Sequence, residues 1–133
     1  MKLRVRYAET DQMGVAHHSV YPIWMEAARV EWLRERGMSY RDIEEQGISL
    51  AVAELTVRYR AAVKFDDELV IETRLTEAKR RRFEYRYQLY RPVDRVAVAV
   101  AKTTHVPTDR RGRAVRLPAH WLERLLPYLQ EPF

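Results

Sequence analysis

The strongest hydrophobic pattern in the chain runs from residue 19 to residue 36. Its apolar positions fall on one face of a helix with 3.6 residues per turn; they are Val20, Ile23, Trp24, Ala27 and Val30. Apolar neighbours widen that face until the first half is apolar nearly all round, which is typical of a helix surrounded by other structure. Ser19 suits the N-cap, Pro22 the first turn and Gly37 the end. We therefore predict a buried helix over residues 19–36.

Elsewhere the pattern changes to alternation, which is typical of strands with one buried face. Four segments alternate in this way: residues 2–7, 54–61, 69–75 and 83–89. A fifth strand is expected over residues 96–106, because it begins with the run VAVAVA over residues 96–101, which is apolar on both faces and predicts a central strand covered on both sides. Two short helices are expected, over residues 39–45 with Ser39 as cap and over residues 120–129 after Pro118.

These elements predict an α+β fold in which a five-stranded antiparallel sheet wraps around one long helix. The links between the four later strands are short, so we expect these strands to form a meander. One helix covers a single face of the sheet, whereas VAVAVA needs cover on both. A partner subunit is the simplest supplier of that cover, so we expect at least a dimer. A length of 133 residues suits a single domain, residues 1–133.

Composition narrows the class of protein. No apolar run approaches 18 residues and no charged and apolar leader opens the chain, so we expect neither a membrane span nor a secretory signal. Cysteine is absent, which excludes disulfides, thiolate nucleophiles and cysteine-based metal sites. We therefore expect a cytoplasmic protein.

The net charge of +5 is spread over 24 basic and 19 acidic side chains that are largely interspersed. Two runs are locally basic, Lys79–Arg82 and Arg110–Arg116. Such runs can bind nucleic acid or a small molecule that carries phosphates. They can equally form a solvated, ion-paired surface. Charge alone leaves these alternatives open.

The polar turn before the long helix holds the candidate chemistry. Asp11, Gly14, His17 and His18 lie there within eight residues. The free N–H groups of a helix start bind anions. Aimed at an ester or thioester carbonyl they form an oxyanion hole, in which one good donor is worth about 3–4 kcal/mol. A carboxylate nearby can attack the carbonyl carbon or activate a water. The plainer alternative is that Asp11 and Thr10 only shape a turn, where Asp is common.

Other chemistries fit the sequence less well. Asp11, His17 and His18 are metal-ligand types, but adjacent histidines rarely point the same way and no second cluster exists, so no metal site is expected. His105 and His120 are distant in the sequence and look incidental. The motifs of a nucleophile elbow, a P-loop and a dinucleotide-binding loop are all missing.

A family resemblance rests on the same stretch. Its spaced residues are Tyr7, Thr10, Asp11, Gly14, Val15 and His18, followed by Tyr21, Trp24, Glu26, Ala28 and Arg29. This pattern resembles the opening signature of hotdog-fold acyl-CoA thioesterases, in particular the YbgC-like branch of the 4-hydroxybenzoyl-CoA thioesterase family. The similarity continues through residues 59–69, YRAAVKFDDEL, and through residues 103–118. It thus covers nearly the whole chain.

The resemblance implies a hotdog fold, homodimers often paired into homotetramers, and active sites at subunit interfaces. It places the family's catalytic aspartate on Asp11. The backbone N–H that polarises the thioester carbonyl, and the histidine side chain of the YbgC-like branch, fall on His18. Tyr7 matches a supporting tyrosine. Glu26 matches a helical glutamate that, at the edge of the apolar stripe, suits a structural rather than a catalytic role.

Two positions depart from the family pattern. His17 stands where many relatives have an aromatic residue, and Pro107 interrupts a strand that usually runs on, which puts the acyl preference and the strand end in doubt. The expected activity is hydrolysis of an acyl-CoA thioester, with Asp11 as nucleophile or general base. Coenzyme A is then part of the substrate, no cofactor is needed, and neither nucleic acid nor membrane is a partner. A hotdog hydratase or dehydratase and a basic nucleic-acid-binding module are the competing hypotheses.

Overall fold

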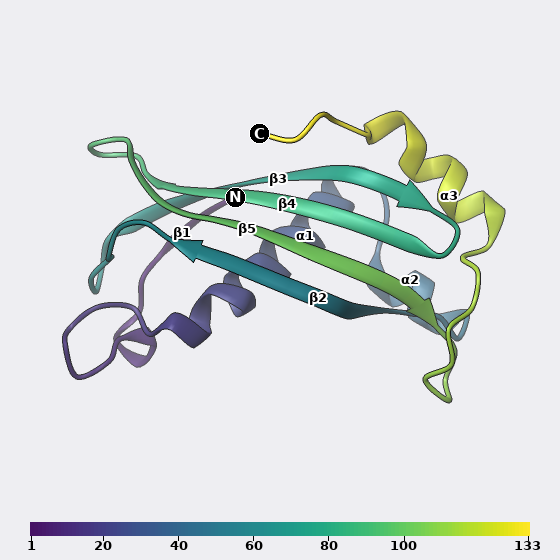
Figure 1. Cartoon of the computed structure of the whole chain (residues 1–133), viewed down its shortest axis with the longest axis horizontal. Coiled ribbons are helices and arrows are strands. Elements are labelled where there is room, and N and C mark those ends of the chain that lie inside the picture. The colour runs from purple at the N-terminus through teal and green to yellow at the C-terminus, as the bar shows by residue number, and fades with distance from the viewer.

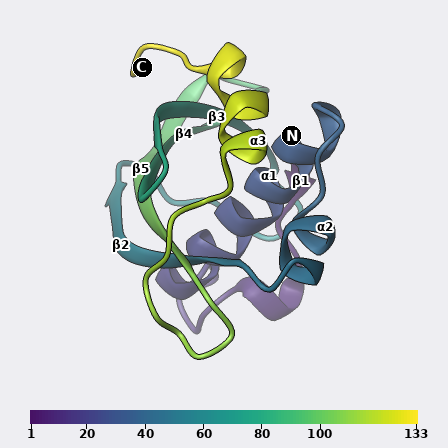
Figure 2. The ribbon, with the colours of Figure 1, turned by 90° about the vertical axis from the view of Figure 1, so that its right-hand side faces the viewer.

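The computed structural model describes residues 1–133 and contains one antiparallel sheet that curls around a long helix (Figures 1 and 2). The strands are β1 (Lys2–Arg4), β2 (Ser49–Tyr59), β3 (Glu68–Lys79), β4 (Arg82–Arg91) and β5 (Val96–Thr108). The helices are α1 (Tyr21–Glu35), α2 (Tyr40–Glu45) and α3 (Ala119–Leu125), with 3₁₀ turns at Tyr7–Glu9, His18–Val20 and Leu126–Tyr128. The predicted fold class, five antiparallel strands around one long helix, is confirmed.

The predicted meander is wrong for β2. The strand order is β1-β3-β4-β5-β2, so only β3, β4 and β5 form a meander, and β2 pairs with β5 at the far edge. The link from β2 to β3, residues 60–67, therefore passes across the end of the sheet. β3 lies three strand spacings from β2, about 14 Å, and eight extended residues span up to about 26 Å. A link of this length is therefore long enough to pass over two strands, so its shortness did not exclude a crossing.

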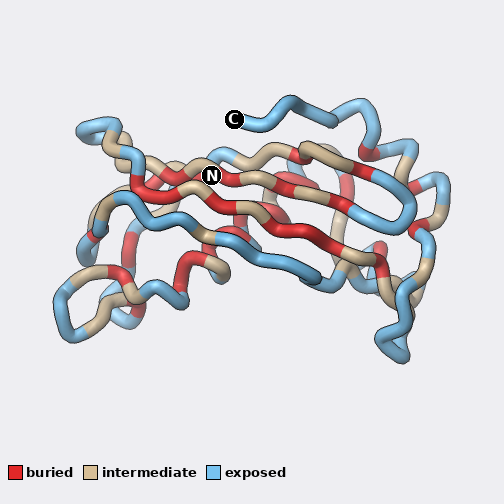
Figure 3. Tube along the Cα trace, viewed as in Figure 1, coloured by how far each residue is buried: buried red, intermediate tan, exposed pale blue.

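The core lies between the concave face of the sheet and α1 (Figure 3). Large side chains alternate along β4, and Tyr87 and Leu89 stand opposite the small Ala101 and Ala99 of β5. This pairing of large with small leaves room for the aromatic face of α1, where Trp24 is buried. The packing of Trp24 against the sheet thus fixes where the N-terminal end of α1 lies.

Several element boundaries differ from the prediction. The first strand ends at Arg4, and Tyr7, predicted as its half-buried last position, begins a 3₁₀ turn and is 75% exposed. The long helix begins with a 3₁₀ turn that is capped by His17 rather than Ser19. At the other end, the C-terminal helix changes to a 3₁₀ turn at Leu126, beside Pro127. Strand β5 runs through Pro107 to Thr108, because the proline lacks only a donor and its carbonyl still accepts from Val115 N–H.

Two parts of the sheet are open, the outer face around Val100 and the edge of β2. β5 is a central strand, as VAVAVA predicted, and its outer face is mixed, with Val57 and Phe133 beside the charged Arg86 and Lys102. β2 is exposed along nearly its whole length (Figure 3), and no strand pairs with its outer edge. None of the helices is long and apolar enough to cross a membrane.

Candidate active site

Asp11 opens a tight turn that its own carboxylate stabilises. Oδ1 accepts from the N–H of Met13 at 2.8 Å and of Val15 at 3.4 Å. The backbone closes the same turn, since Asp11 N–H donates to Val15 O at 2.8 Å and Gly14 N–H to Asp11 O at 2.9 Å. Gly14 has a φ of +79°, which disfavours any side chain. One carboxylate oxygen is therefore committed to the turn, and Oδ2 is left for other contacts.

The helix start is ordered by His17. Its Nδ1 accepts from Ser19 N–H at 3.2 Å and lies 2.7 Å from Ser19 Oγ. Its carbonyl accepts from Val20 N–H at 3.1 Å. His18 follows the cap residue His17, and its N–H is the first of the 3₁₀ turn. This N–H therefore has no acceptor within the turn. The helix thus presents the His18 N–H ahead of the first turn, where the helix dipole favours negative charge.

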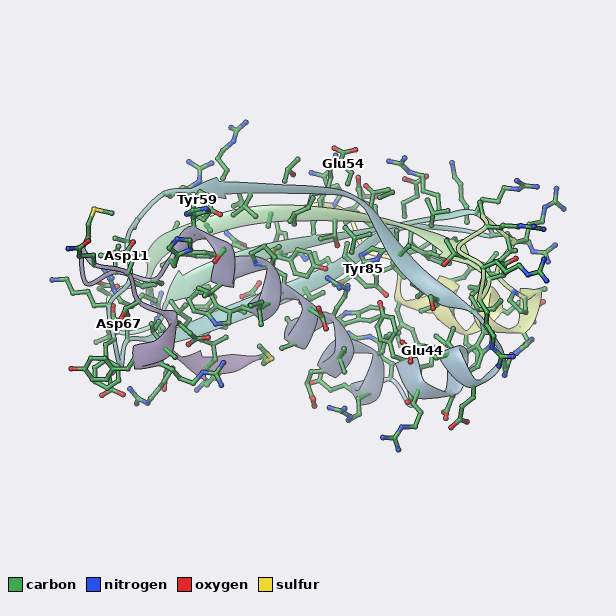
Figure 4. The ribbon with its side chains drawn as sticks, turned by 90° about the horizontal axis from the view of Figure 1, so that it is seen from below. Asp11, Glu44, Glu54, Tyr59, Asp67 and Tyr85 are labelled. Atoms are coloured by element: carbon green, nitrogen blue, oxygen red, sulfur yellow. The ribbon has the colours of Figure 1, made fainter.

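A groove of about 380 Å³ joins the two features. Asp11 and His18 both line it, together with Tyr21 of α1 and Tyr59 at the end of β2. Figure 4 places Asp11 and Tyr59 at the same end of the molecule, beside the start of α1. The predicted pair of Asp11 and His18 therefore lies in one groove, with Asp11 half-buried rather than directed into bulk solvent.

A buried carboxylate that sequence reasoning missed holds this end together. Glu9 is 6% exposed and accepts from Trp24 Nε1 at 2.7 Å, from Arg6 N–H at 2.7 Å and from the Arg6 guanidinium at 3.0 Å. Burial raises the pKa of Glu9, but these hydrogen bonds outweigh it and hold the pKa below its usual value. The Glu9 carbonyl also accepts from His17 N–H at 2.8 Å. The sequence offered one faint signal, Arg6 three residues earlier.

The other two predicted site residues lie outside the groove. Tyr7 stacks on Phe65 with ring centroids 4.1 Å apart, and its side chain does not line the groove. Glu26 is exposed on α1 and makes no hydrogen bond or ion pair. The structure does not bring either residue to Asp11.

The histidines separate into three environments. The rings of His17 and His18 stack at 4.2 Å, so these neighbours do point the same way, contrary to expectation. No three side chains of His, Asp or Glu gather in a group able to hold a metal ion. His105 is not incidental: it is fully buried, with Nε2 2.8 Å from Thr103 Oγ1. Burial and the charge of Arg29 lower the pKa of His105 to about 4, against a smaller opposing effect of Leu50 O. His120 is exposed on α3.

The two basic runs meet at the opposite end of the molecule. Leu117 N–H donates to Arg80 O at 2.7 Å, and Arg80 Nε donates back to Leu117 O at 3.0 Å. Six exposed arginines of this end form no ion pair: Arg80, Arg81, Arg110, Arg111, Arg113 and Arg116. The surface that these six form is called the basic end below.

Known proteins share both the sequence pattern and the architecture. Residues 5–125 match the family model of the thioesterase-like superfamily. The acyl-CoA thioesterase YbgC of Haemophilus influenzae is 33% identical over 78% of this chain and 77% of its own. Protein TT1821 of Thermus thermophilus superimposes with a TM-score of 0.90 at 38% identity, over 96% of this chain and 97% of its own. The DHNA-CoA thioesterase of Staphylococcus aureus gives a TM-score of 0.91 at 28% identity, over 96% and 87%. The chain is therefore a hotdog-fold enzyme that belongs to the thioesterase-like superfamily.

Proposed function

We propose that the protein hydrolyses acyl-CoA thioesters, with Asp11 as nucleophile or general base. The observation that carries this proposal is the groove that Asp11 shares with the helix start at His18. A turn alone would explain Asp11, and a helix start alone would explain His18. A carboxylate and a free backbone donor in one groove are the two groups that attack on a thioester requires. The relatives named as thioesterases of CoA substrates support the same class.

The reaction then follows from the two groups. The carbonyl oxygen of the thioester accepts from the His18 N–H, which stabilises the negative charge that develops on that oxygen. As nucleophile, Asp11 Oδ2 bonds to the carbonyl carbon, the carbon–sulfur bond breaks and the CoA thiolate leaves; water then hydrolyses the acyl-aspartyl anhydride. As general base, Asp11 takes a proton from water, whose oxygen bonds to the carbon instead. Either route yields the free acid and CoA.

The two histidines have different roles in this proposal. His17 Nδ1 is engaged with Ser19 and serves as a cap. The His18 ring is exposed, lines the groove and makes no hydrogen bond within the chain. It can therefore orient the attacking water or protonate the leaving thiolate. Tyr7 and Glu26 have no part in the reaction proposed.

A homodimer through the open edge of β2 completes the proposal, with pairs of dimers forming a tetramer. Side chains of β2 and its free edge are exposed, and long unpaired edges favour pairing with another strand. The basic end lies beside Ser49 at the start of β2, about 33 Å along the strand from Tyr59 at the groove. Two antiparallel copies of β2 would bring the partner's basic end towards the groove. Its arginines would then face the phosphates of CoA.

Thiol release from a panel of acyl-CoAs tests the proposal, with Asp11→Ala measured beside the wild type. We expect turnover to fall by about 10³-fold or more, within the range of a lost general base or nucleophile, while size on gel filtration is unchanged. Single-turnover hydrolysis in ¹⁸O-labelled water distinguishes the two routes, since label in the Asp11 carboxylate requires the anhydride. Wild-type turnover in Asp11→Ala would overturn the proposal. Enoyl formation without thiol release would favour the hydratase.

The cytoplasmic location stays a prediction.

A further inference from the structure

Side chains form hydrogen bonds to both the C=O and the N–H of the peptide group between His18 and Ser19. At one end Tyr59 Oη donates to the His18 carbonyl at 2.8 Å. At the other end the Ser19 N–H donates to His17 Nδ1 at 3.2 Å. Tyr59 lies 41 residues from His18 in the chain and reaches it from the end of β2. A peptide plane held at its oxygen and at its nitrogen is not free to rotate.

The sequence removes the α-helical donor from the His18 carbonyl. In an α-helix the His18 carbonyl would accept from the N–H of the residue four positions later. That residue is Pro22, which has no N–H. The Tyr59 hydroxyl supplies the donor that the proline lacks. His18 lies in the 3₁₀ turn His18–Val20, in which a carbonyl faces the residue three positions later, so the Tyr59 hydroxyl adds a tertiary contact from β2 to this carbonyl.

The same contacts decide which backbone donor stays open. Ser19 N–H is taken by the imidazole of His17, and Val20 N–H by the His17 carbonyl. That carbonyl belongs to the peptide link that also carries the His18 N–H. The hydrogen bond from Val20 therefore fixes the plane of the His18 N–H itself. Of the three backbone donors of the 3₁₀ turn, those of His18, Ser19 and Val20, only the His18 N–H stays open, and both neighbouring planes are held.

Aromatic and polar contacts brace Tyr59 and His17 against α1. The Tyr59 ring packs edge-to-face on Tyr21 at 4.9 Å, and Tyr21 packs on Trp24 at 4.9 Å. Trp24 donates to Glu9, whose carbonyl accepts from His17 N–H. The contacts thus close a ring around the 3₁₀ turn.

We infer that Tyr59 and His17 are positioning residues, which hold the His18–Ser19 peptide so that the His18 N–H is the donor offered to the thioester carbonyl. The inference rests on the proposed function. Neither side chain needs to touch the substrate. An oxyanion donor acts by being aimed before the reaction begins, so a loosened turn lowers the rate of the chemical step and leaves substrate binding nearly unchanged.

Tyr59→Phe is the first test, since it removes the hydroxyl and keeps the ring. We expect kcat to fall about 10-fold, less than the 10²- to 10³-fold cost of losing an oxyanion donor outright, with KM changed by less than about twofold. Tyr128→Phe is the matched control. Tyr128 is 38% exposed against 48% for Tyr59, and its hydroxyl makes no hydrogen bond. An unchanged kcat in Tyr59→Phe would overturn the inference.

Variants of His17 test the second hydrogen bond, from the Ser19 N–H to the His17 imidazole. His17→Leu removes the acceptor for Ser19 N–H, and we expect a loss of kcat similar to that of Tyr59→Phe. His17→Asn restores an oxygen that caps helix starts well, so it should recover most of the rate. Because both side chains hold one peptide link, the double variant Tyr59→Phe with His17→Leu should be about as slow as the slower single variant. Fully multiplicative losses would mean two independent roles.

A spectroscopic measurement distinguishes a change in the orientation of the His18 N–H from general damage to the fold. The probe is the ketone analogue of an acyl-CoA, with methylene in place of sulfur and ¹³C at the carbonyl. Bound to the wild type, its carbonyl stretch should shift to lower frequency than in buffer, and the shift should shrink in Tyr59→Phe. An equal shift in both proteins would contradict the inference. Asp11→Ala in the same thiol-release assay keeps the two proposals distinct. If Asp11→Ala is inactive and Tyr59→Phe is as fast as wild type, the proposed function is supported and the positioning role of Tyr59 is wrong.

Discussion

The chain contains the same turn twice, once at each end of the sheet. Asp109 Oδ1 accepts from the N–H of Arg111 at 2.8 Å and of Arg113 at 3.0 Å, as Asp11 Oδ1 accepts from residues two and four positions on. Gly112 has a φ of +77° where Gly14 has +79°. The backbone bonds that close the two turns also correspond. In both, an aspartate followed three residues later by glycine shapes the chain.

What differs is the surroundings of each turn. The Asp11 turn is tied to the buried Glu9 through His17 N–H and lies at a helix start, in a groove with His18. The Asp109 turn lies on the exposed basic end, with arginines on either side. Turn geometry therefore accounts for an aspartate at either place and for chemistry at neither. The proposed chemistry depends on the free donor and the groove that only the first turn has.

The largest expected effect comes from changing the two aspartates in the same way. Asn keeps an oxygen that accepts the turn's hydrogen bonds, so both Asp11→Asn and Asp109→Asn should fold. We expect thiol release to fall by about 10³-fold in Asp11→Asn and to stay within about twofold of wild type in Asp109→Asn. Steady-state kinetics on one acyl-CoA measures both.

The result that would erase the contrast is an equal loss in the two variants. Thermal unfolding supplies the control, since the two asparagine variants should have similar midpoints. A large drop in midpoint for Asp11→Asn alone would mean that the lost rate reports lost structure.

The second largest effect expected is on stability in acid, where the groups at the two ends of the molecule should lose their contributions over different pH ranges. Near the basic end, His105 has a pKa of about 4 in the fold, because burial and Arg29 disfavour its charge, against about 6.5 unfolded. The unfolded chain binds the extra proton between these values, so stability is full above about pH 6.5 and is lost as pH falls towards 4, by about 3 kcal/mol. Glu9, at the Asp11 end, has a lowered pKa, so its contribution is lost only as pH falls below the ordinary glutamate range.

Urea unfolding at pH 7 and pH 4.5 measures this difference. We expect His105→Gln to lose less stability over that interval than wild type, because the titrating group is gone. A chain of donors explains why His105 stays neutral: Arg29 donates to Tyr87, and only a neutral ring lets Nε2 accept from Thr103 while Nδ1 donates to Leu50 O. An equal loss of unfolding free energy between pH 7 and pH 4.5 in both proteins would show that protonation of His105 does not cause the loss of stability in acid.

Glu9 gives the third contrast, because the Asp109 turn has no buried anchor. Replacing Glu9 by Leu leaves the buried Trp24 indole N–H and the part-buried Arg6 N–H without an acceptor, and an unsatisfied buried donor costs about 1–3 kcal/mol. We expect a loss of about 2–3 kcal/mol in unfolding free energy together with slower thiol release. The counterpart, Arg80→Ala, removes a single part-buried hydrogen bond to Leu117 O and should cost about 1 kcal/mol. Comparable losses would mean that the Asp11 end is not specially anchored.

Local signals predicted much of this molecule. Periodicity located α1 and all five strands, and the spacing of Asp11 and His18 around Gly14 located the pair that lines the groove. These succeed because a helix face, a strand and a tight turn are each decided by residues close together in the chain. The family resemblance added the roles assigned to Asp11 and His18, and those roles stay predictions.

Contacts between distant segments could not be read in the same way. The place of β2 beside β5 depends on which strands pair across the sheet, which no single strand specifies. Tyr59 reaches His18 only because of that placement. His105 looked incidental because its partners lie on other strands or two residues away. Tyr7 was misplaced because alternation continues past the last residue that pairs, Arg4.

The smallest effect expected is also the most evenly matched. A Cβ added at Gly14 or at Gly112 would meet no atom within 4 Å, so Gly14→Ala and Gly112→Ala differ from wild type only through strain at positive φ. We expect each to lose about 1 kcal/mol in unfolding free energy. Only Gly14→Ala should also slow thiol release, by several-fold, because the turn that tilts carries Asp11. Equal stability with unequal rate would show that the same backbone strain matters to chemistry at one end alone; slower release in both would mean that strain anywhere in the fold reaches the groove, and the contrast between the two turns would no longer identify the site.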